Sequence, residues 1–244
     1  MSGTVRLDRL LANLGYGSRR EVQQLVRFGA VTLDGAPVDD ADMRLKLESS
    51  LSERMRVQGA KLDPVPGLVL MLHKPAGLTC SHKEGGALVH ELLPPRWRMR
   101  EPKISTVGRL DKETTGLLLL TDDGDLLHRI ISPKHHVAKR YLATLARPLA
   151  GDEGERFASG ELMLEGEDKP LAPAVLAPLS PTRAWLTVTE GRYHQVRRMF
   201  AAVGNHVEAL HRDRVGGLDL PEDLAPGAYR LLSAAQIDEI FAGG

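Results

Sequence analysis

A stretch rich in glycine and proline divides the chain into two parts with different hydrophobic patterns. Residues 59–67 hold two glycines and two prolines, which disfavour the interior of helices and strands and are typical of a connection between domains. A chain of 244 residues is long enough for one small and one larger domain. We therefore expect a domain at residues 1–60, a linker at 61–67 and a second domain at 68–244.

The first part has the pattern of two short helices followed by a hairpin. Leucines at helical spacing end at Gly15, a residue typical of a helix C-cap. Ser18, followed three residues later by Glu21, predicts a capping box at the start of a second helix. The pair Asp34 and Gly35 lies between two short apolar runs and predicts a tight turn. These signals together indicate a compact helix-hairpin module.

The second part alternates strand and helix patterns without the regular rhythm of a parallel α/β fold. Several links between predicted strands are short, which favours antiparallel pairing. We expect an α+β fold with a large mixed, mainly antiparallel sheet flanked by helices. The predicted strands are residues 68–73, 117–121, 139–146, 161–164, 174–177, 184–189 and 206–215. The predicted helices are residues 125–131, 152–158, 194–203 and 233–241.

Basic residues gather in three segments, although the formal net charge of the chain is zero. Residues 1–30 carry five arginines against two acids, residues 96–112 carry six cations against two acids, and residues 128–141 carry four cations and no acid. If these segments share a face, the protein has the electrostatic footprint of a polyanion binder. Charge scattered evenly over the surface is the alternative.

The sequence lacks the features of secreted, membrane and metal-binding proteins. Its longest apolar run, residues 116–120, is far too short to span a bilayer, and the first residues do not form a charged and then apolar leader. The single Cys80 excludes an internal disulfide and a cysteine-rich metal site. We therefore expect a cytoplasmic protein with no membrane partner and no bound metal.

Two clusters of polar residues in the second part interrupt the apolar pattern. Arg109 and Asp111 lie in a turn-rich loop between apolar runs, and loops held by rigid strands are where reactive groups are displayed. An aspartate that only forms the turn is the alternative. Farther along, strand alternation places Lys139 and Tyr141 on one face and Arg140 on the other. A solvated edge strand is the alternative there.

A third cluster runs from the end of a strand into a helix. Apolar residues between Val196 and Val203 form the stripe that a helix buries. The polar residues left to point outward are Arg192, His194, Gln195 and Arg198. A helix N-terminus with arginines and backbone donors suits a phosphate group, whereas ordinary solvated cations are the alternative. The adjacent His135 and His136 have no third ligand nearby, so they do not predict a zinc site.

Together the three clusters resemble the signature motifs of the RNA pseudouridine synthases, most closely the branch that acts on small-subunit ribosomal RNA. Residues 108–111, Gly-Arg-Leu-Asp, are similar to the motif whose aspartate is the nucleophile. Residues 139–141 resemble the strand motif that supplies the active-site tyrosine. Residues 190–199 resemble the third motif, whose second arginine, here Arg197, pairs with the aspartate. The resemblance extends nearly from end to end and is weakest over residues 82–103.

The first part resembles the small RNA-binding domain named after the fourth small-subunit ribosomal protein. Residues 6–8, 17–20 and 29–35 carry this resemblance, which covers about forty residues. It implies that the amino-terminal domain binds RNA ahead of a catalytic domain. The residues expected to contact RNA in this domain are Arg6, Arg19 and Arg20.

The resemblance implies a reaction that cuts the N-glycosidic bond of a uridine, turns the uracil and rejoins it through carbon, without a cofactor or a metal. Asp111 would be the nucleophile, attacking the ribose C1′ or the uracil ring. Tyr141 would lie against the flipped base and is a candidate for removing the C5 proton, with Arg197 paired to Asp111. Arg109 would fill the vacated space or hold a phosphate. The remaining expected RNA contacts are Lys139, Arg192, His194, Gln195 and Arg198.

The expected substrate is a uridine of 16S small-subunit ribosomal RNA within a pre-ribosomal particle, and the expected enzyme is a monomer. A synthase for a 23S large-subunit uridine is one alternative. A noncatalytic RNA-binding assembly factor is another, but it would not need an acid such as Asp111 beside an anionic ligand. A hydrolase using Asp111 with a histidine is less favoured, because the sequence has no metal-ligand motif and no activated serine.

Overall fold

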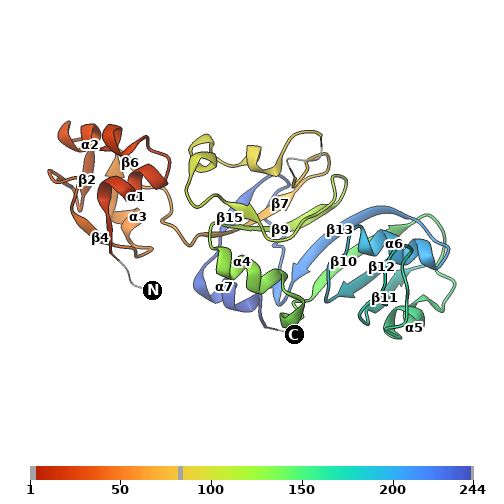
Figure 1. Ribbon diagram of the computed structural model, residues 1–244. Helices are drawn as coiled ribbons and strands as arrows, with labels where there is room; N and C mark the ends of the chain where they lie inside the picture. Colours follow the sequence, from red (N-terminus) through yellow and green to blue (C-terminus); the bar gives the residue numbers. More distant parts are fainter. Residues whose placement is uncertain (1–3, 82–84, 243–244) are drawn as a thin grey trace. The chain divides into compact units, whose positions relative to one another are not determined.

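A computed structural model describes residues 4–81 and 85–242 of the chain. Residues 82–84, within the segment where the family resemblance is weakest, lie outside the described residues. The chain forms two compact units (Figure 1). The first unit contains Met1–Leu68, Leu93–Ser105 and Thr121–Asp123. The second unit contains Val69–Leu92, Thr106–Leu120 and Gly124–Gly244.

The first unit has the predicted helices and hairpin. Its elements are β1 (Thr4–Arg6), α1 (Leu7–Asn13), α2 (Arg19–Arg27), β2 (Val31–Leu33), β3 (Ala36–Pro37), β4 (Arg44–Lys46), α3 (Leu51–Arg54), β5 (Met55–Val57), β6 (Ala60–Lys61) and the short 3-10 helix η2 (Pro95–Met99). Strand β1 pairs with β4, and the others form a sheet in the order β3-β2-β5-β6. Buried leucines and valines from α1, α2, β2 and β5 form one core.

Local signals in the first unit are confirmed. Ser18 accepts a hydrogen bond from the Glu21 backbone, and the Glu21 side chain bonds back to the Ser18 backbone, so the capping box starts α2. Asp34 and Gly35 both have positive φ, 51° and 84°, the backbone that a two-residue hairpin turn requires. Gly15, with φ 87°, follows Leu14, the C-cap of α1, and lets the chain leave the helix.

The segment predicted as a linker is bonded to other parts of the first unit. The carbonyl of Pro64 accepts a hydrogen bond from Arg100 at 2.8 Å, and the amide of Gly67 donates to Asp122 at 2.8 Å. Arg100 and Asp122 form an ion pair at 2.8 Å with both side chains buried. Residues 61–67 are therefore a packed segment, because side chains from much later in the sequence bind their backbone. The domain boundaries stay a prediction.

The second unit is built on a mixed sheet, which has nine strands in the part of the chain that the structure describes. Its elements are β7 (Val69–Lys74), η1 (Val89–Leu92), β8 (Ser105–Thr106), β9 (Thr115–Thr121), α4 (Gly124–Ile131), η3 (Pro133–His135), β10 (Lys139–Leu145), α5 (Glu153–Ala158), β11 (Val175–Ser180), β12 (Arg183–Val188), α6 (Gln195–Ala202), β13 (Val207–Val215), β14 (Leu218–Asp219), β15 (Tyr229–Leu231) and α7 (Ala234–Glu239). The main order is β11-β12-β10-β13-β9-β7-β15, with β14 on β13 and β8 on β9.

The expected α+β architecture is confirmed, with one strand wrongly predicted. Strands β9 and β13 are parallel, whereas β10 is antiparallel to both of its neighbours, β12 and β13. Residues 161–164 do not form a strand. Leu164 is buried in a core and Leu162 packs against it, so the apolar residues of this segment reflect packing on that core and not pairing in a ladder.

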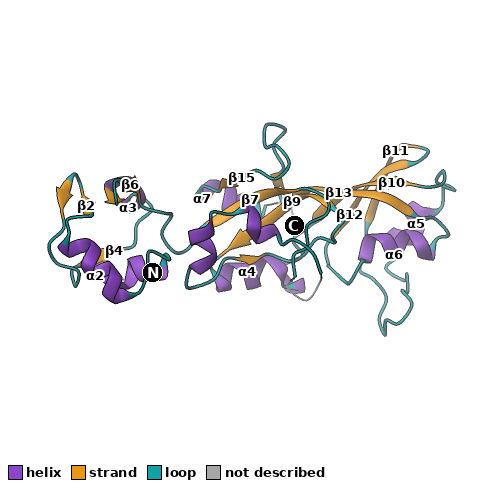
Figure 2. Cartoon of the chain, turned by 90° about the horizontal axis from the view of Figure 1, so that it is seen from above, coloured by secondary structure: helices purple, strands orange, loops and turns teal. Residues whose placement is uncertain are grey.

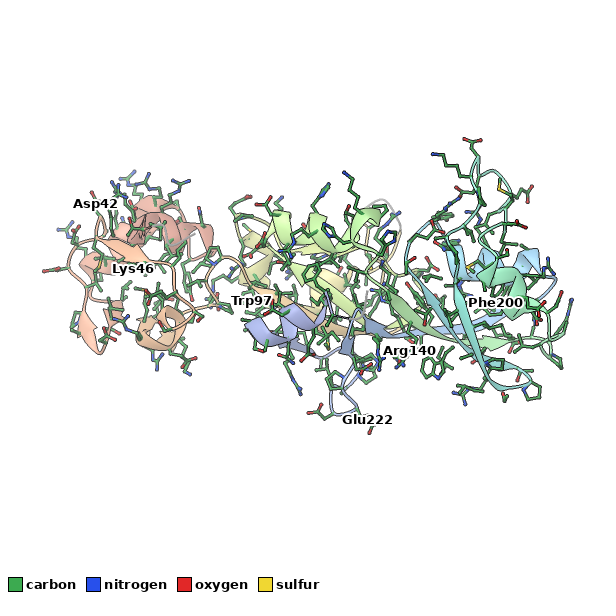
Figure 3. All side chains as sticks on the ribbon, turned by 90° about the horizontal axis from the view of Figure 1, so that it is seen from below. Asp42, Lys46, Trp97, Arg140, Phe200 and Glu222 are labelled. Carbon is green, nitrogen blue, oxygen red and sulfur yellow. The ribbon has the colours of Figure 1, made fainter. Side chains whose placement is uncertain are left out.

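Helices cover the sheet around two cores (Figure 2). Helices α5 and α6 pack on β10, β12 and β13. Phe200, labelled in Figure 3, meets Phe157 edge to face at 5.3 Å between ring centroids. Residues of α4 and the C-terminal segment join β7 and β9 in the second core. Among the described residues, no helix is long and apolar enough to cross a membrane.

Candidate active site

A cavity of about 220 Å³ opens in the second unit, where the loop before β9, the strands β10 and β13 and the start of α6 meet. It brings together residues that are up to about a hundred positions apart in sequence. The predicted site residues that line it are Arg109, Asp111, Lys139, Tyr141, Arg192, His194, Gln195 and Arg197. All three predicted catalytic residues therefore face one space.

The loop that carries Asp111 is held from beneath by Lys74. Its side chain is fully buried at the end of β7, and its ammonium donates to the carbonyls of Lys112 at 2.9 Å and Thr114 at 2.8 Å. Burial lowers the pKa of Lys74 from its ordinary value. The amide of Thr114 in turn donates to the carbonyl of Asp111 at 3.0 Å. These bonds fix the backbone of the loop, so the aspartate is presented from a rigid support.

Two side chains from α6 and its N-cap approach the carboxylate of Asp111. Arg197 Nε lies 3.7 Å from Asp111 Oδ2, and His194 Nε2 lies 3.4 Å from Asp111 Oδ1. Arg197 is anchored by a 2.8 Å bond to the carbonyl of Val207. His194 has a left-handed backbone with φ 49°, and its ring stacks on Tyr193 at 3.8 Å between centroids. The guanidinium is thus held near the carboxylate, at a distance where opposite charges attract.

Strand β10 presents Lys139 and Tyr141 to the cavity, as alternation predicted. Lys139 Nζ donates to the carbonyl of Val137 at 2.9 Å. Burial, assisted by the positive charge of Arg212, lowers the pKa of Lys139 to about 8. Its charge therefore depends on pH within a range where most lysines stay protonated.

Arg140 leaves the opposite face of the same strand. Arg140, labelled in Figure 3, donates to Asp213 at 3.0 Å, and its guanidinium lies 4.7 Å from the centroid of the Trp185 ring. It does not line the cavity. The alternation of polar residues on β10 thus separates an inward pair from an outward arginine.

Arg192 and Arg198 do not point freely outward as the helical pattern predicted. Arg192 donates to Glu190 at 3.2 Å and to Glu167 at 3.3 Å. Arg198 donates to Glu167 at 2.8 Å and to the carbonyl of Glu165 at 2.6 Å. The prediction failed because Glu167, the acid that binds both arginines, comes from a loop 25 residues before Arg192 and 31 residues before Arg198. Contact of either arginine with RNA stays a prediction.

Gln195 is also turned inward, contrary to the same prediction. Only 5% of it is exposed. Its carbonyl oxygen accepts from the Arg192 amide at 2.8 Å, and its amide nitrogen donates to Glu190 at 3.1 Å. These bonds stabilise the turn into α6, so the structure gives Gln195 a supporting position at the cavity wall.

In the first unit, a buried acid forms ion pairs with two of the three arginines that are predicted to contact RNA. The side chain of Asp8 is fully buried and pairs with Arg6 at 2.9 Å and Arg19 at 2.8 Å. Burial by itself raises the pKa of Asp8, but the hydrogen bonds from both arginines lower it to about 2. Arg6 also pairs with Asp42. Arg20 is exposed on the surface of α2. The roles of these arginines toward RNA stay predictions.

Two residues that shape the site were missed by the sequence reasoning. Arg212 lines the cavity from β13 and is only 3% exposed, but its sequence neighbours His211, Asp213 and Arg214 make the strand look solvated. Lys74 ends an apolar run, and that position was its only signal. Within the described residues, no three His, Cys, Asp or Glu side chains are grouped to hold a metal ion.

Comparison with known proteins identifies the family. The sequence model of the RNA pseudouridylate synthases matches residues 68–202, which include the loop of Asp111, strand β10 and helix α6. The chain belongs to the RNA pseudouridylate synthases. In this RNA pseudouridylate synthase a second family, the S4 domain, matches residues 5–50.

Relatives of this pseudouridylate synthase match it over nearly its whole length. The ribosomal small subunit pseudouridine synthase A of Escherichia coli strain K12 is 43% identical, over 97% of this chain and 100% of the relative. The protein of that name from Yersinia pestis is 42% identical, over 98% of this chain and 99% of the relative. A crystal structure described as a pseudouridylate synthase is 37% identical with a TM-score of 0.67, and covers 97% of this chain and 99% of its own.

Proposed function

We propose that this enzyme converts a specific uridine of 16S small-subunit ribosomal RNA to pseudouridine. The observation that carries the proposal is a carboxylate, Asp111, in a cavity that also holds an arginine and a tyrosine. Near full-length similarity to proteins named as small-subunit ribosomal synthases supports the choice of RNA. The proposed setting is the cytoplasm, with a monomeric enzyme that meets its RNA in a pre-ribosomal particle.

Asp111 is the nucleophile in this proposal. A carboxylate is ordinarily ionised at neutral pH and forms a covalent bond to carbon without activation by another base. Arg197, anchored to the carbonyl of Val207, keeps its guanidinium 3.7 Å from that carboxylate. The pairing offsets the cost of withdrawing the acid from water when RNA covers the cavity.

The other cavity residues bind and orient the RNA. Tyr141 lies against the extruded uracil, whose planar face suits an aromatic ring. Arg109, exposed at the cavity, takes the space that the flipped nucleotide leaves or holds its phosphate. Lys139 and His194 contact the target nucleotide. We assign Arg192, Gln195 and Arg198 a weaker part in RNA binding, because their described bonds go to protein groups.

Residues 1–60 form the RNA-binding domain in this proposal, joined through residues 61–67 to a catalytic domain at 68–244. Similarity to the S4 domain over residues 5–50 supports it. Arg20 contacts RNA directly, whereas Arg6 and Arg19 do so while they remain paired with Asp8. A tethered second contact of this kind raises affinity by holding the RNA near the cavity.

The proposal is tested by mapping pseudouridines after purified 16S and 23S RNA, free and in ribosomal precursors, are incubated with the enzyme. We expect one new pseudouridine in 16S RNA. Asp111→Asn should form none while binding RNA within about threefold of wild type, because the amide has the same shape but is a poor nucleophile. The matched control is Glu113→Gln, which removes the charge of an exposed acid in the same loop. This variant should remain active.

The remaining outcomes decide among the alternatives. Modification of 23S RNA alone would favour the large-subunit synthase. Tight binding of 16S RNA without any modification by the wild type would favour a noncatalytic assembly factor. Turnover by Asp111→Asn within about tenfold of wild type would remove Asp111 from the role of nucleophile.

A further inference from the structure

Arg212 is a buried cation at the cavity wall with an unusual set of partners. Its side chain is 3% exposed. Its Nε donates to the carbonyl of Leu117 at 2.8 Å, and its Nη1 donates to the hydroxyl of Tyr141 at 3.2 Å. Among the described residues, no carboxylate lies within ion-pair distance of Arg212, whereas Arg140 and Arg214 of the same sheet both pair with Asp219. A buried charge without an acid is costly, so its position at the cavity wall points to a use.

The backbone fixes this arrangement tightly. Arg212 is paired with Tyr141 across β10 and with Gly116 across β9. A Cβ atom added to Gly116 would lie 2.1 Å from the carbonyl oxygen of Arg212, so only glycine allows the two strands to approach so closely. Three adjacent strands of the sheet therefore hold the guanidinium beside the tyrosine, so its position does not depend on a flexible loop.

The direction of the hydrogen bond between these two side chains follows from their chemistry. A guanidinium has five N–H donors and no acceptor. The oxygen of Tyr141 must therefore accept from Arg212, and its own hydrogen must point elsewhere. Because Tyr141 also lines the cavity, that hydrogen is available to a ligand there.

We propose that Arg212 is a positioning residue that holds Tyr141 as a hydrogen-bond donor toward the uracil base. The inference rests on the proposed function and deepens it. When the C1′–N1 bond breaks, its electron pair leaves with uracil and spreads to the carbonyl oxygens. Attack on the ring by Asp111 would likewise move an electron pair onto a uracil carbonyl oxygen. In both routes a donor aimed at that oxygen stabilises the charge that develops.

The arrangement also fits a later step: once the hydroxyl has given its hydrogen to the uracil anion and the new carbon–carbon bond has formed, the tyrosine oxygen takes the C5 proton and becomes a hydroxyl again. Arg212 donates to that oxygen whether it is a hydroxyl or carries negative charge. The bond from Nε to Leu117 keeps the guanidinium in place throughout. The positive charge of Arg212 thus favours electron-rich states of both the tyrosine and the base.

The test is a double-mutant cycle between Arg212 and Tyr141. Single-turnover rates and RNA dissociation constants are measured for Arg212→Met, Tyr141→Phe and the double variant. We expect Arg212→Met to slow pseudouridine formation by about tenfold to a hundredfold while RNA affinity changes less than about threefold. The double variant should be no slower than Tyr141→Phe, because without the hydroxyl there is nothing to orient. Rate losses that multiply would overturn the proposal.

Two further variants separate positioning from loss of structure. Arg212→Lys keeps a buried cation and should recover part of the rate. Arg214→Met, on the same strand but paired with exposed Asp219, is the matched control and should turn over like wild type. An Arg212→Lys rate equal to that of Arg212→Met would contradict a role for the cation.

A spectroscopic measurement tests the hydrogen bond between Arg212 and the Tyr141 oxygen without requiring turnover. With 3-fluorotyrosine incorporated at position 141, the fluorine chemical shift should move in Arg212→Lys and stay unchanged in Arg214→Met. If the wild type modifies no RNA, the proposed function fails, and this signal still shows whether Arg212 bonds to the tyrosine oxygen. A shift that is the same in all three proteins would overturn the inference even if the wild type is active.

Discussion

At the scale of single residues, Lys139 is a cavity group whose charge changes with pH near pH 8. Burial and the nearby Arg212 lower its pKa to about 8, whereas a lysine in the unfolded chain titrates near its ordinary value of about 10.4. Between these two values the unfolded state binds more protons than the folded state, so stability rises with pH in that window. Below pH 8 the folded protein bears the cost of a buried charge.

Replacement of Lys139 by methionine should therefore stabilise the protein at pH 7. We expect a gain of about 1–2 kcal/mol in the free energy of unfolding, after allowance for solvent screening, and the gain should shrink as the pH rises from 8 toward 10.5. Turnover should fall, because a cation facing the RNA is lost. Urea unfolding of wild type, Lys139→Met and the exposed control Lys112→Met at pH 7 and pH 10 measures this. A gain equal at both pH values would contradict the lowered pKa.

Gly116 is a second position that the geometry of the site depends on, because an added Cβ atom would displace a neighbouring strand. Its φ is +107°, and a Cβ would meet the backbone of Arg212 at 2.1 Å. We expect Gly116→Ala to lower the free energy of unfolding by about 2–4 kcal/mol and to reduce turnover by displacing Arg212. Gly124→Ala, where an added Cβ meets no atom within 4 Å, is the control and should be close to neutral. Wild-type stability of Gly116→Ala in urea unfolding would mean that the strands separate at little cost.

At the scale of elements, the amino-terminal helices are joined by a charge cluster. Buried Asp8 on α1 pairs with Arg19 at the start of α2 and with Arg6 ahead of α1. The pKa of Asp8 is lowered to about 2, so its contribution to stability is present above about pH 4 and is lost as the pH falls through 2.

Asp8→Asn should destabilise the first unit by about 1–2 kcal/mol at neutral pH, since it leaves two arginines without their shared acid. The difference from wild type should narrow as the pH falls toward 2, where wild-type Asp8 also becomes neutral. The midpoints of urea unfolding of wild type and Asp8→Asn at pH 7, 4 and 2.5 measure this difference. Asp39→Asn, at an exposed position, is the control. A difference that stays constant down to pH 2 would show that the carboxylate charge is unimportant.

At the scale of the whole molecule, the two units should contribute differently to RNA binding. Among the described residues, the exposed arginines of the amino-terminal helices that form no ion pair are Arg9, Arg20 and Arg27, whereas exposed Arg19 is paired with Asp8. Changing all three to glutamine should reduce the slope of log affinity against log salt by up to about 2.7, since each lost phosphate contact removes roughly 0.7–0.9. Turnover at saturating RNA should not change, because the predicted catalytic residues lie in the second unit.

Substitution is a cleaner test of this than deletion of residues 1–60. Deletion would leave Leu62, part of the first core, without its neighbours. It would also remove Asn13, whose carbonyl binds the Glu101 amide. A control triple change of Arg44, Arg54 and Arg56 to glutamine removes the same charge from the strands of that unit and its α3. If both triple variants alter the salt slope equally, RNA binding depends on total charge and not on the helices.

Features set by short-range interactions were determined by the sequence alone. The capping boxes of α2 and α7 close hydrogen bonds over three residues, so the identity of the residues suffices to predict them. Strand alternation has a period of two, which placed Lys139 and Tyr141 together and Arg140 apart. The α+β class followed from the same local patterns.

Only the tertiary structure decided which distant groups meet. Lys74 binds the backbone of the Asp111 loop 38 residues later, and Arg212 reaches Tyr141 from 71 residues away. Arg192 and Arg198 form ion pairs with Glu167, although the sequence pattern predicted that both side chains point into solvent. Such partners depend on strand order and register, which arise from packing of the whole core. The periodicity of residues within one segment therefore does not predict these distant partners.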